Sequence, residues 1–533
     1  MTKITYKSIF LLGLLLLSTG LYAASEAEFG KLSKAWTLHA DGSQEFRCGE
    51  ELTLFTHTAM NGTYGETFIV YNPDFQELKI HSSYTKQKDG SIVKTPDNAF
   101  VEVLPRFAAD APAYNKLKEM VVVHTGLELG ATIYLDYSII TKPGYYPELD
   151  VNAFLQETSP VKEYTVSISV PEGKTLGKHL YGSNAKPAEK KQEGMKTVSW
   201  TLRNVPASSR EAFQPENRDD SPRLTASTYT SGKEALSAMD KRFKDSKDYE
   251  SKTFAQFITE KATDDNEKVK LIQSHVVNNL GYSAVPLSET GYTLRDADEV
   301  LRSAYGTLAE KTCLLNTMLN AAEIKSEIVA IYPGIVDTDA CGLSTIKGLA
   351  VKATVAGKDQ FLSANSLAPS TLTPRGGLDN IYSLSGTPIQ VKASPIQVKE
   401  NKAVTVSKDQ VKDGFAICTL PTVSTGLDSW SMSALNSKRS GVFEIPALIQ
   451  EEITYTITPA EGLKLQTPAA ERLVSNSLGK VTRTITPKGN SYEVVRTIEL
   501  NKQQFTPAEY EQVRSLIHEW VNPDNRVLLF STL

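Results

Sequence analysis

Alternating apolar and polar residues in the first half of the chain predict β-strands. Within residues 131–140, Ile133, Leu135, Tyr137 and Ile139 alternate with smaller or polar residues. A period of two places every second side chain on one face, as in a strand that is covered on one side. Similar runs, separated by Gly, Pro or Asp, occur at residues 68–73, 77–85, 120–127, 163–173, 197–207 and 224–230. Together these runs predict an antiparallel β-sandwich over residues 24–235.

The period changes to that of an α-helix at residue 264. Acidic residues stand near the start of this segment and Gly281 follows its end. Four apolar residues fall on one helical face, namely Val269, Ile272, Val276 and Leu280. A second short helix is expected over residues 296–304.

Residues 305–322 are the segment around which the middle of the chain is organised. They predict a turn and then a helix that buries four apolar side chains, Leu314, Leu315, Met318 and Leu319. Strands are expected directly after it at residues 327–332, 349–355 and 360–362. We therefore predict an α+β core over residues 236–385.

After an irregular polar stretch that starts at Pro369, β-strand patterns return. Residues 386–533 predict a β-rich C-terminal domain with a linker at its start and one terminal helix. Thr506 is the expected N-cap of that helix, with Pro507 at the first helical position and Glu509 at the third. The predicted fold class is multidomain α+β.

The first 23 residues predict a secretory signal peptide. Lys3 and Lys7 precede a short apolar run at residues 9–17, and small residues allow cleavage after Ala23 or Ala24. The apolar run is too short to span a membrane comfortably, and no later stretch is long and apolar enough to do so. The expected location is therefore the periplasm or the cell envelope.

The composition of the chain limits the classes of partner that we expect. The chain has 533 residues, 22% of them charged, and a formal net charge of −5 at pH 7. This mild acidity gives no reason to expect nucleic acid or an anionic membrane as a partner. The length suits two to four domains that each bury a core.

The cysteines do not form a metal or disulfide pattern. Their spacing is wide and irregular, at Cys48, Cys313, Cys341 and Cys418. An exported chain could pair them in three ways, and the sequence does not choose among them. Asp296 with Asp298, and Asp337 with Asp339, lack the spacing of a calcium loop and suit turns or helix caps better. No metal and no cofactor are expected.

Three segments carry a resemblance to a known family: RNVPASSREAFQPENRDDSPRLTAS before the core, ALNSKRSGVFEIP after it, and PAEYEQVRSL near the end. In this order they resemble a bacterial exported family. Its members have an uncharacterised N-terminal β-domain, a transglutaminase-like core of papain-like fold and a C-terminal β-domain. The resemblance covers nearly the whole mature chain.

The resemblance implies a Cys–His–Asp triad in the core. The family's cysteine stands at the start of the central helix, where a helix N-terminus lowers the pKa of a thiol. Matching residues 306–311 and the following leucines to that segment puts Leu308 at the nucleophile position. The histidine position falls on Gly348 or Lys347, and the acid position falls on Ser363. All three catalytic groups are thus predicted to be replaced.

The histidine count agrees with the loss of the triad. The seven histidines stand at positions 39, 57, 81, 124, 179, 275 and 518. None lies between residues 276 and 517, where the family's base must be. A leucine at position 308 cannot attack an acyl carbon.

Two cysteines, Cys313 and Cys341, are weaker candidates for the nucleophile. Cys313 lies five residues beyond Leu308, a rotation of roughly 140° and a rise of about 7.5 Å along a helix. It should therefore face away from the cleft, and His275 is a poor candidate for its base. Cys341 is expected in a loop with no histidine nearby in the sequence.

The sequence favours a non-catalytic function. We expect an exported transglutaminase-like protein that binds or scaffolds in the cell envelope, with an envelope protein, a peptide or a glycan as partner. The aromatic residues Tyr145, Tyr146 and Trp430 could line a binding surface, although packing is their default role. The alternatives are a thiol-dependent amidase or protease that uses Cys313 or Cys341, and a purely structural assembly protein.

Overall fold

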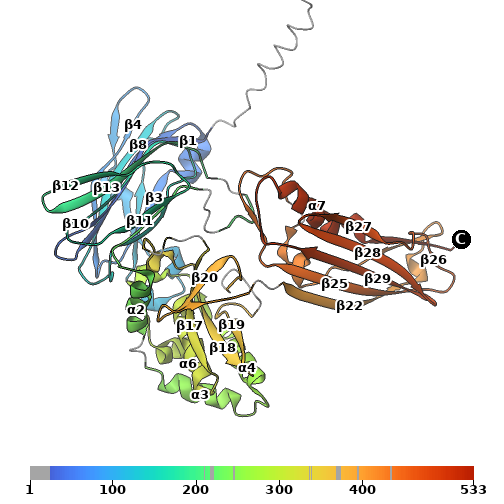
Figure 1. Cartoon of the computed structure of the whole chain (residues 1–533). Helices are drawn as coiled ribbons and strands as arrows, with labels where there is room; N and C mark the ends of the chain where they lie inside the picture. Colours follow the sequence, from blue (N-terminus) through green and yellow to red (C-terminus); the bar gives the residue numbers. More distant parts are fainter. Residues whose placement is uncertain are drawn as a thin grey trace, which may run out of the picture.

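The computed structural model describes residues 25–208, 211–215, 221–243, 247–334, 337, 339–367, 374–392, 395–432 and 435–532. The predicted signal peptide and its cleavage site lie outside these residues. The chain forms a β-rich N-terminal part, a central α+β part and a β-rich C-terminal part (Figure 1). The predicted fold class is confirmed.

The N-terminal part is built on an eight-stranded sheet with the order β12-β13-β10-β1-β2-β8-β4-β5. Its strands are β1 (Ala27–Leu38), β2 (Gln44–Leu54), β4 (Gln76–Lys86), β5 (Ile92–Lys94), β8 (Thr132–Thr141), β10 (Val161–Pro171), β12 (Ala188–Gln192) and β13 (Met195–Val205). Strand β1 pairs antiparallel with β2 but parallel with β10. The large sheet is therefore mixed at this one pair rather than antiparallel throughout.

Two small sheets complete the sandwich. One has the order β11-β14-β9 and the other β3-β7-β6. Their strands are β11 (Gly177–Tyr181), β14 (Arg223–Ser227), β9 (Asp150–Phe154), β3 (Glu66–Tyr71), β7 (Lys118–Val123) and β6 (Phe100–Val103). Leu224 of β14 and Val151 of β9 belong to one buried cluster with Val166 and Trp200 of the large sheet. This burial of apolar side chains holds the layers together.

The central part packs helices against a five-stranded sheet with the order β19-β18-β17-β20-β21. The helices are α2 (Gly232–Phe243), α3 (Tyr249–Thr259), α4 (Asp265–Asn278), α5 (Ala297–Ser303) and α6 (Leu308–Ala321). The strands are β17 (Ser326–Pro333), β18 (Gly348–Val355), β19 (Lys358–Leu362), β20 (Asp379–Ser383) and β21 (Pro388–Ile389), and β15 (Gly281–Ser283) pairs with β16 (Tyr305–Thr307). The four apolar residues predicted to be buried on α6 are fully buried.

The C-terminal part contains a five-stranded sheet with the order β22-β25-β29-β28-β27, a three-stranded sheet β23-β31-β26 and the pair β24-β30. The strands are β22 (Ile396–Val406), β23 (Phe415–Thr419), β24 (Phe443–Glu444), β25 (Ile449–Pro459), β26 (Lys464–Leu465), β27 (Arg472–Asn476), β28 (Gly479–Lys488), β29 (Ser491–Leu500), β30 (Gln504–Phe505) and β31 (Val527–Ser531). Helix α7 (Tyr510–Val521) buries Val513, Leu516 and Trp520 in the same cluster as the sheet residues Ile453 and Phe530.

Helix α7 begins three residues later than the sequence predicts. The predicted N-cap contact does form, since Glu509 Oε2 accepts hydrogen bonds from Thr506 N at 2.9 Å and from Thr506 Oγ1 at 3.0 Å. However, Glu509 N donates to Thr506 O, so residues 506–509 close a tight turn before the helix. Regular helix starts only at Tyr510.

The described part of the segment around residue 211 contacts the C-terminal part. Glu211 accepts hydrogen bonds from Ser440 N at 2.8 Å and Gly441 N at 3.0 Å. The Phe213 ring packs edge-on against Phe443, with ring centroids 5.9 Å apart. The short strand β24 thus lies in the part of the C-terminal domain that this segment contacts.

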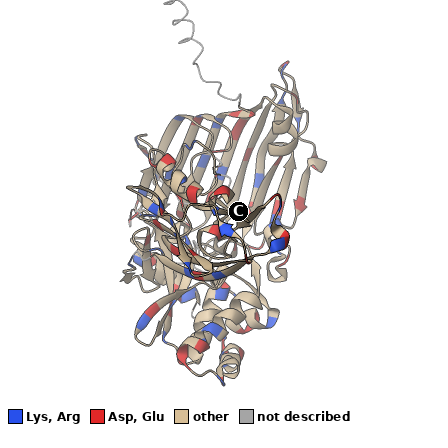
Figure 2. Cartoon of the chain, turned by 90° about the vertical axis from the view of Figure 1, so that its right-hand side faces the viewer, with Lys and Arg blue, Asp and Glu red and all other residues tan. Residues whose placement is uncertain are grey.

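Acidic and basic residues are interspersed along the same strands and helices in Figure 2. Among the described helices, none has the length and apolar character needed to cross a membrane.

A buried ion-pair network joins the central and C-terminal parts. Arg375 donates to Asp379 and, through Nη1, to Glu444 Oε1 at 2.6 Å. Glu444 Oε2 also accepts from Gln504 Nε2 at 2.6 Å. Lys347 Nζ lies 3.3 Å from Asp379 Oδ1, and this pair is almost fully buried. A charge removed from this network leaves its partner without full compensation in a dry site.

We therefore expect Glu444→Gln to lower the free energy of unfolding by about 3 kcal/mol, because Arg375 loses a buried counter-charge. Urea denaturation followed by circular dichroism measures this loss. The matched control is Glu452→Gln, which breaks an exposed pair with Lys399 and should change stability by less than about 0.5 kcal/mol. Equal effects of the two substitutions would contradict a structural role for the buried network.

Candidate functional site

The start of α6 is fixed by a capping box. Thr307 is the N-cap, and its Oγ1 accepts a hydrogen bond from Glu310 N at 3.3 Å. In return, Glu310 Oε2 accepts from Thr307 N at 2.8 Å. The two bonds satisfy N–H groups that have no partner within the helix. Leu308, the residue predicted to stand at the nucleophile position, is consequently the first residue of the helix.

Glu310 also joins the helix to two other parts of the chain. Its carboxylate accepts from Arg295 Nε and Nη2, both at 3.0 Å, and from Tyr114 Oη at 2.5 Å. Burial acts to raise the pKa of Glu310, but the bonds from Arg295 and Tyr114 outweigh it and hold this pKa below its usual value. Tyr114 comes from the N-terminal part, so this bond helps to seat that part on the core.

A cleft of about 440 Å³ opens at the start of α6. It is lined by residues of the central part and by Asn152 of the N-terminal part: Asn152, Tyr282, Ala284, Val285, Pro286, Leu287, Ser288, Tyr292, Thr307, Leu308, Ala309, Leu343, Ser344, Ile346, Lys347, Gly348 and Leu349. No cysteine and no histidine is among these described lining residues. The lining of the cleft is therefore mostly apolar, with a few hydroxyl and amide groups and one lysine, Lys347.

The structure brings two of the three predicted triad positions to this cleft. Leu308 and Gly348 both line it, as does Lys347, the other residue considered for the histidine position. Ser363 does not line it. That residue is buried beside α4, where its carbonyl oxygen accepts from Gln273 Nε2 at 3.0 Å and its Oγ accepts from Asn365 N at 3.1 Å. The loss of the triad stays a prediction.

The two fallback cysteines lie outside the cleft. Cys313 is partly buried one and a half turns into α6, and burial raises the pKa of its thiol well above the usual value. Cys341 is buried beside α2 and Tyr332, and burial raises the pKa of its thiol to about 12. All four cysteines of the chain are thiols rather than disulfides. His275 packs its ring 4.7 Å from that of Phe254 on α3.

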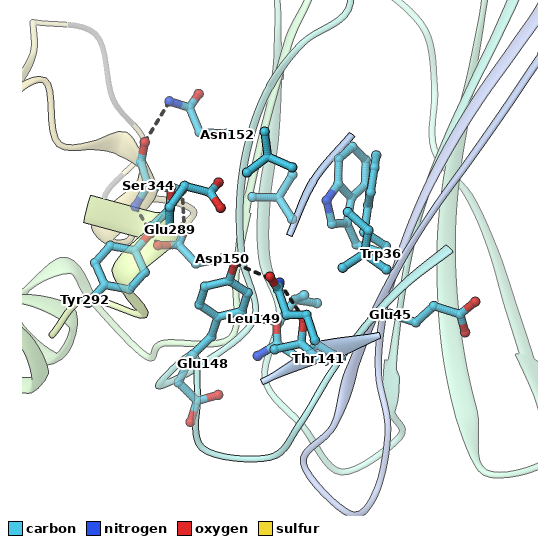
Figure 3. A pocket seen from close by; sticks show the side chains of 18 residues that line it. Trp36, Glu45, Thr141, Glu148, Leu149, Asp150, Asn152, Glu289, Tyr292 and Ser344 are labelled. Carbon is cyan, nitrogen blue, oxygen red and sulfur yellow. Dashed lines mark hydrogen bonds between the residues drawn. The ribbon is translucent and has the colours of Figure 1, made fainter. Parts of the chain in front are cut away.

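A second cavity, of about 290 Å³, lies between the N-terminal and central parts (Figure 3). Its walls combine aromatic rings, amides and carboxyl groups from both parts: Trp36, Gln44, Glu45, Phe46, Val70, Gln76, Ile139, Thr141, Tyr146, Glu148, Leu149, Asp150, Val151, Asn152, Ser288, Glu289, Tyr292 and Ser344. Cavities between domains are common sites of ligand binding. The aromatic doublet singled out in the sequence supplies Tyr146 to this wall, whereas Tyr145 is buried.

Asp150 connects the two parts at this cavity. Its carboxylate accepts from Ser344 N and from Ser344 Oγ, both at 2.8 Å. A Cβ atom on Gly342 would lie 2.4 Å from Asp150 Oδ2, so only glycine allows this close approach. Asn152 adds a bond from its Nδ2 to Ser344 O at 3.0 Å. Burial raises the pKa of Asp150 to about 6, although the bonds from Ser344 oppose this effect.

Glu289 lines the same end of the cavity as Asp150 and Ser344 (Figure 3). The hydroxyl of Tyr145 donates to the backbone oxygen of Glu289 at 2.7 Å, which fixes the segment. The Glu289 carboxylate itself has no hydrogen-bond or ion-pair partner among the residues that the structure describes. Burial raises the pKa of this carboxyl group to about 7.

No group of three or more His, Cys, Asp or Glu within the described ranges could hold a metal ion. Asp296 caps α5 by accepting from Glu299 N at 2.9 Å, and Asp298 accepts from Ser251 N at 2.8 Å. Asp337 accepts from Asp339 N at 3.0 Å. These aspartates therefore have structural contacts of the kind that the sequence favoured.

The residues that the sequence analysis missed are Asp150, Glu289 and Tyr292. Each comes from a segment without a recognisable motif, and only the docking of the two parts brings them together. The acidic and aromatic character of residues 145–150 was the one available signal.

Three family models match this chain. A domain of unknown function (DUF3857) matches residues 40–209, the transglutaminase-like superfamily matches residues 252–342, and a second domain of unknown function (DUF3858) matches residues 416–530. Each match falls within one of the predicted domains, whose limits stay predictions. No curated protein matches the chain.

Solved structures give one extensive similarity. A structure described as "a putative protease from Parabacteroides distasonis" is 71% identical, with a TM-score of 0.90, over 95% of this chain and 99% of that one. A second, described as "a putative cysteine protease from Cytophaga hutchinsonii", is 13% identical with a TM-score of 0.20 over 44% of this chain and 83% of that one. The second likeness is too weak to carry an argument.

The position of Leu308 can be tested with an introduced thiol. We expect Leu308→Cys to react with iodoacetamide near pH 7 at least about tenfold faster than Cys313, because a helix N-terminus stabilises a thiolate. Labelling rates for each cysteine are read by mass spectrometry. The matched control is Ala321→Cys at the opposite end of α6, where the helix dipole disfavours the thiolate. Equal rates at positions 308 and 321 would show that the helix start does not activate a thiol.

Proposed function

Because this chain belongs to the transglutaminase-like superfamily, we propose that it is a non-catalytic member that binds a ligand in the cleft beside Leu308. The observation that carries this proposal is the identity of the first residue of α6. On the family match, a leucine takes the position of the thiol that acyl transfer needs, and neither a cysteine nor a histidine lines the cleft among the described residues. Without a nucleophile and its base, the mechanism has no first step.

The cleft nevertheless keeps features that suit binding. Its floor is held by the Thr307–Glu310 capping box and by the buried Arg295–Glu310 pair, so its geometry is fixed before a ligand arrives. A preformed site loses less conformational entropy on binding than a flexible one. We further propose that the mature protein is exported after cleavage near Ala23 or Ala24 and that its β-rich parts contact an envelope protein, a peptide or a glycan.

The second candidate is a thiol-dependent amidase or protease that uses Cys313 or Cys341. The description of the 71% identical structure as a protease favours it. Against it, both thiols have a raised pKa because they are buried, and neither lines the cleft. A thiol that stays protonated near pH 7 is a poor nucleophile.

Thiol labelling of the mature protein separates the two candidates. With the pKa of Cys341 at about 12, against about 8.5 for an ordinary thiol, we expect labelling by iodoacetamide at pH 7.5 to be at least roughly 100-fold slower than that of glutathione. Cys313 should be slow for the same reason. Labelling after denaturation in urea is the control, and all four cysteines should then react at ordinary rates.

The matching activity measurement uses amide substrates. We expect no hydrolysis and no amine incorporation with casein or with glutamine-containing peptides, and no difference between the wild type and Cys313→Ala or Cys341→Ala. Turnover that either alanine variant abolishes would overturn the proposal and establish the thiol enzyme.

A further inference from the structure

The cavity of about 290 Å³ between the N-terminal and central parts, which we call the interdomain cavity, adjoins the cleft beside Leu308. The two share the lining residues Asn152, Ser288, Tyr292 and Ser344. A molecule bound in the cleft therefore passes these shared residues before it reaches the carboxyl groups of the cavity. Any ligand long enough to occupy both spaces is in contact with the N-terminal part as well as the core.

The charged side chains that line the interdomain cavity are all acidic. Four carboxyl groups line it, those of Glu45, Glu148, Asp150 and Glu289, and its described lining contains no lysine or arginine. Protein groups compensate three of them. Ser138 Oγ donates to Glu45 at 2.6 Å, and Ser344 binds Asp150. Lys174, which lies outside the lining, pairs with Glu148 at 2.8 Å.

Glu289 is the exception, because no described residue donates to its carboxylate. A partly buried carboxylate without a counter-charge is costly unless it is protonated or meets a cation. A cationic ligand would supply the missing charge.

Tyr292 gives an independent sign of a ligand. Its side chain is more than nine-tenths buried, yet its hydroxyl has no hydrogen-bond partner among the described residues. Tyr292 lines both the cavity and the cleft, and Figure 3 shows it at the same end of the cavity as Glu289. Its φ of +60° is unusual for a bulky residue, and it directly follows Gly291, which also has a positive φ. Such a backbone conformation persists only where the surrounding structure holds it, and residues of this kind cluster at functional sites.

The aromatic rings and the volume of the interdomain cavity limit the class of ligand that it can bind. Trp36, Phe46 and Tyr146 present aromatic groups to the cavity, and aromatic faces attract ammonium and guanidinium groups. A volume of about 290 Å³ suits one long side chain rather than a folded segment, while the cleft of about 440 Å³ has room for the neighbouring main chain.

We propose that the interdomain cavity binds one lysine or arginine side chain of an extended peptide whose main chain lies in the cleft beside Leu308. The inference rests on the proposed ligand-binding function and names its ligand class. The cationic group donates hydrogen bonds to the Glu289 carboxylate and to the lone pairs of the Tyr292 oxygen. No bond is made or broken in this step.

Binding to full-length mature protein by isothermal titration calorimetry tests the proposal. The probes are the blocked pentapeptides Gly-Gly-Lys-Gly-Gly and Gly-Gly-Arg-Gly-Gly, with Gly-Gly-Gln-Gly-Gly as the neutral match. We expect the lysine and arginine peptides to bind at least tenfold more tightly than the glutamine peptide. Chitotriose is included as a neutral glycan and should not bind.

Two substitutions test the residues. Glu289→Gln should weaken binding of the lysine peptide at least tenfold, because it removes the charge at constant shape. Tyr292→Phe removes only the hydroxyl and should weaken binding by a factor of about three to ten. Glu461→Gln, which removes an equally negative group from an exposed site of the C-terminal part, is the control and should leave binding unchanged. Circular dichroism confirms that each variant is folded.

The outcomes separate this inference from the proposed function. Equal binding of the lysine and glutamine peptides, or an unchanged affinity of Glu289→Gln, would overturn the basic-side-chain assignment. Loss of that equal binding in Leu308→Trp would still support a ligand-binding cleft. Binding of chitotriose alone, or of none of the probes, would also overturn the peptide assignment. Hydrolysis of an amide substrate, in contrast, would overturn the proposed function whatever the affinities.

Discussion

The carboxylate of Glu310 is buried at the first turn of the central helix, and groups from three regions of the chain hold it there. Thr307 binds it from the helix N-cap, Arg295 from the segment before α5, and Tyr114 from the N-terminal part. Removing a carboxylate from water is costly, so the charge is tolerated only because all these donors are present together. The start of α6, the floor of the cleft and the seat of the N-terminal part therefore depend on one group.

The start of the helix does not depend on the side chain at position 308. The contacts of Glu310 are made by the N-cap backbone and by neighbouring side chains, and none of them involves residue 308. The helix therefore keeps its start and its dipole whatever residue stands there. The polar groups of the adjoining cleft are hydroxyl and amide groups and the amine of Lys347, whereas the neighbouring cavity is acidic and aromatic. Fold alone does not fix function.

The sequence was a good guide wherever the determining interactions are local. The caps of α4 and α5 at Asp264 and Asp296, and the buried face of α6, follow from periodicity and capping signals within a few residues. Before Tyr510, a turn replaces the first residues of the predicted helix, so α7 begins three residues later than predicted. The contacts of Glu211 could not be predicted, because they are with residues more than two hundred positions away.

The same reasoning limits what could be foreseen of the site. Leu308 and Gly348 were placed by matching a family pattern, and the structure puts both at one cleft. Glu289 and Tyr292 meet Asp150 at one cavity only because the N-terminal and central parts dock. No short-range sequence pattern encodes that docking. Ser363 shows the opposite case, because it directly follows β19 and lies beside Gln273 of α4 rather than in the cleft.

Strand β1 sits in the middle of the largest sheet, between β2 and β10. It is the first described strand of the chain, yet its parallel partner ends only at Pro171. While the chain is being synthesised, the sheet cannot close until that distant partner has emerged. Non-local pairings of this kind delay folding because the intervening loop must be ordered first. The middle of the largest sheet is therefore completed only after the strands that lie between β1 and β10 in the sequence have been made.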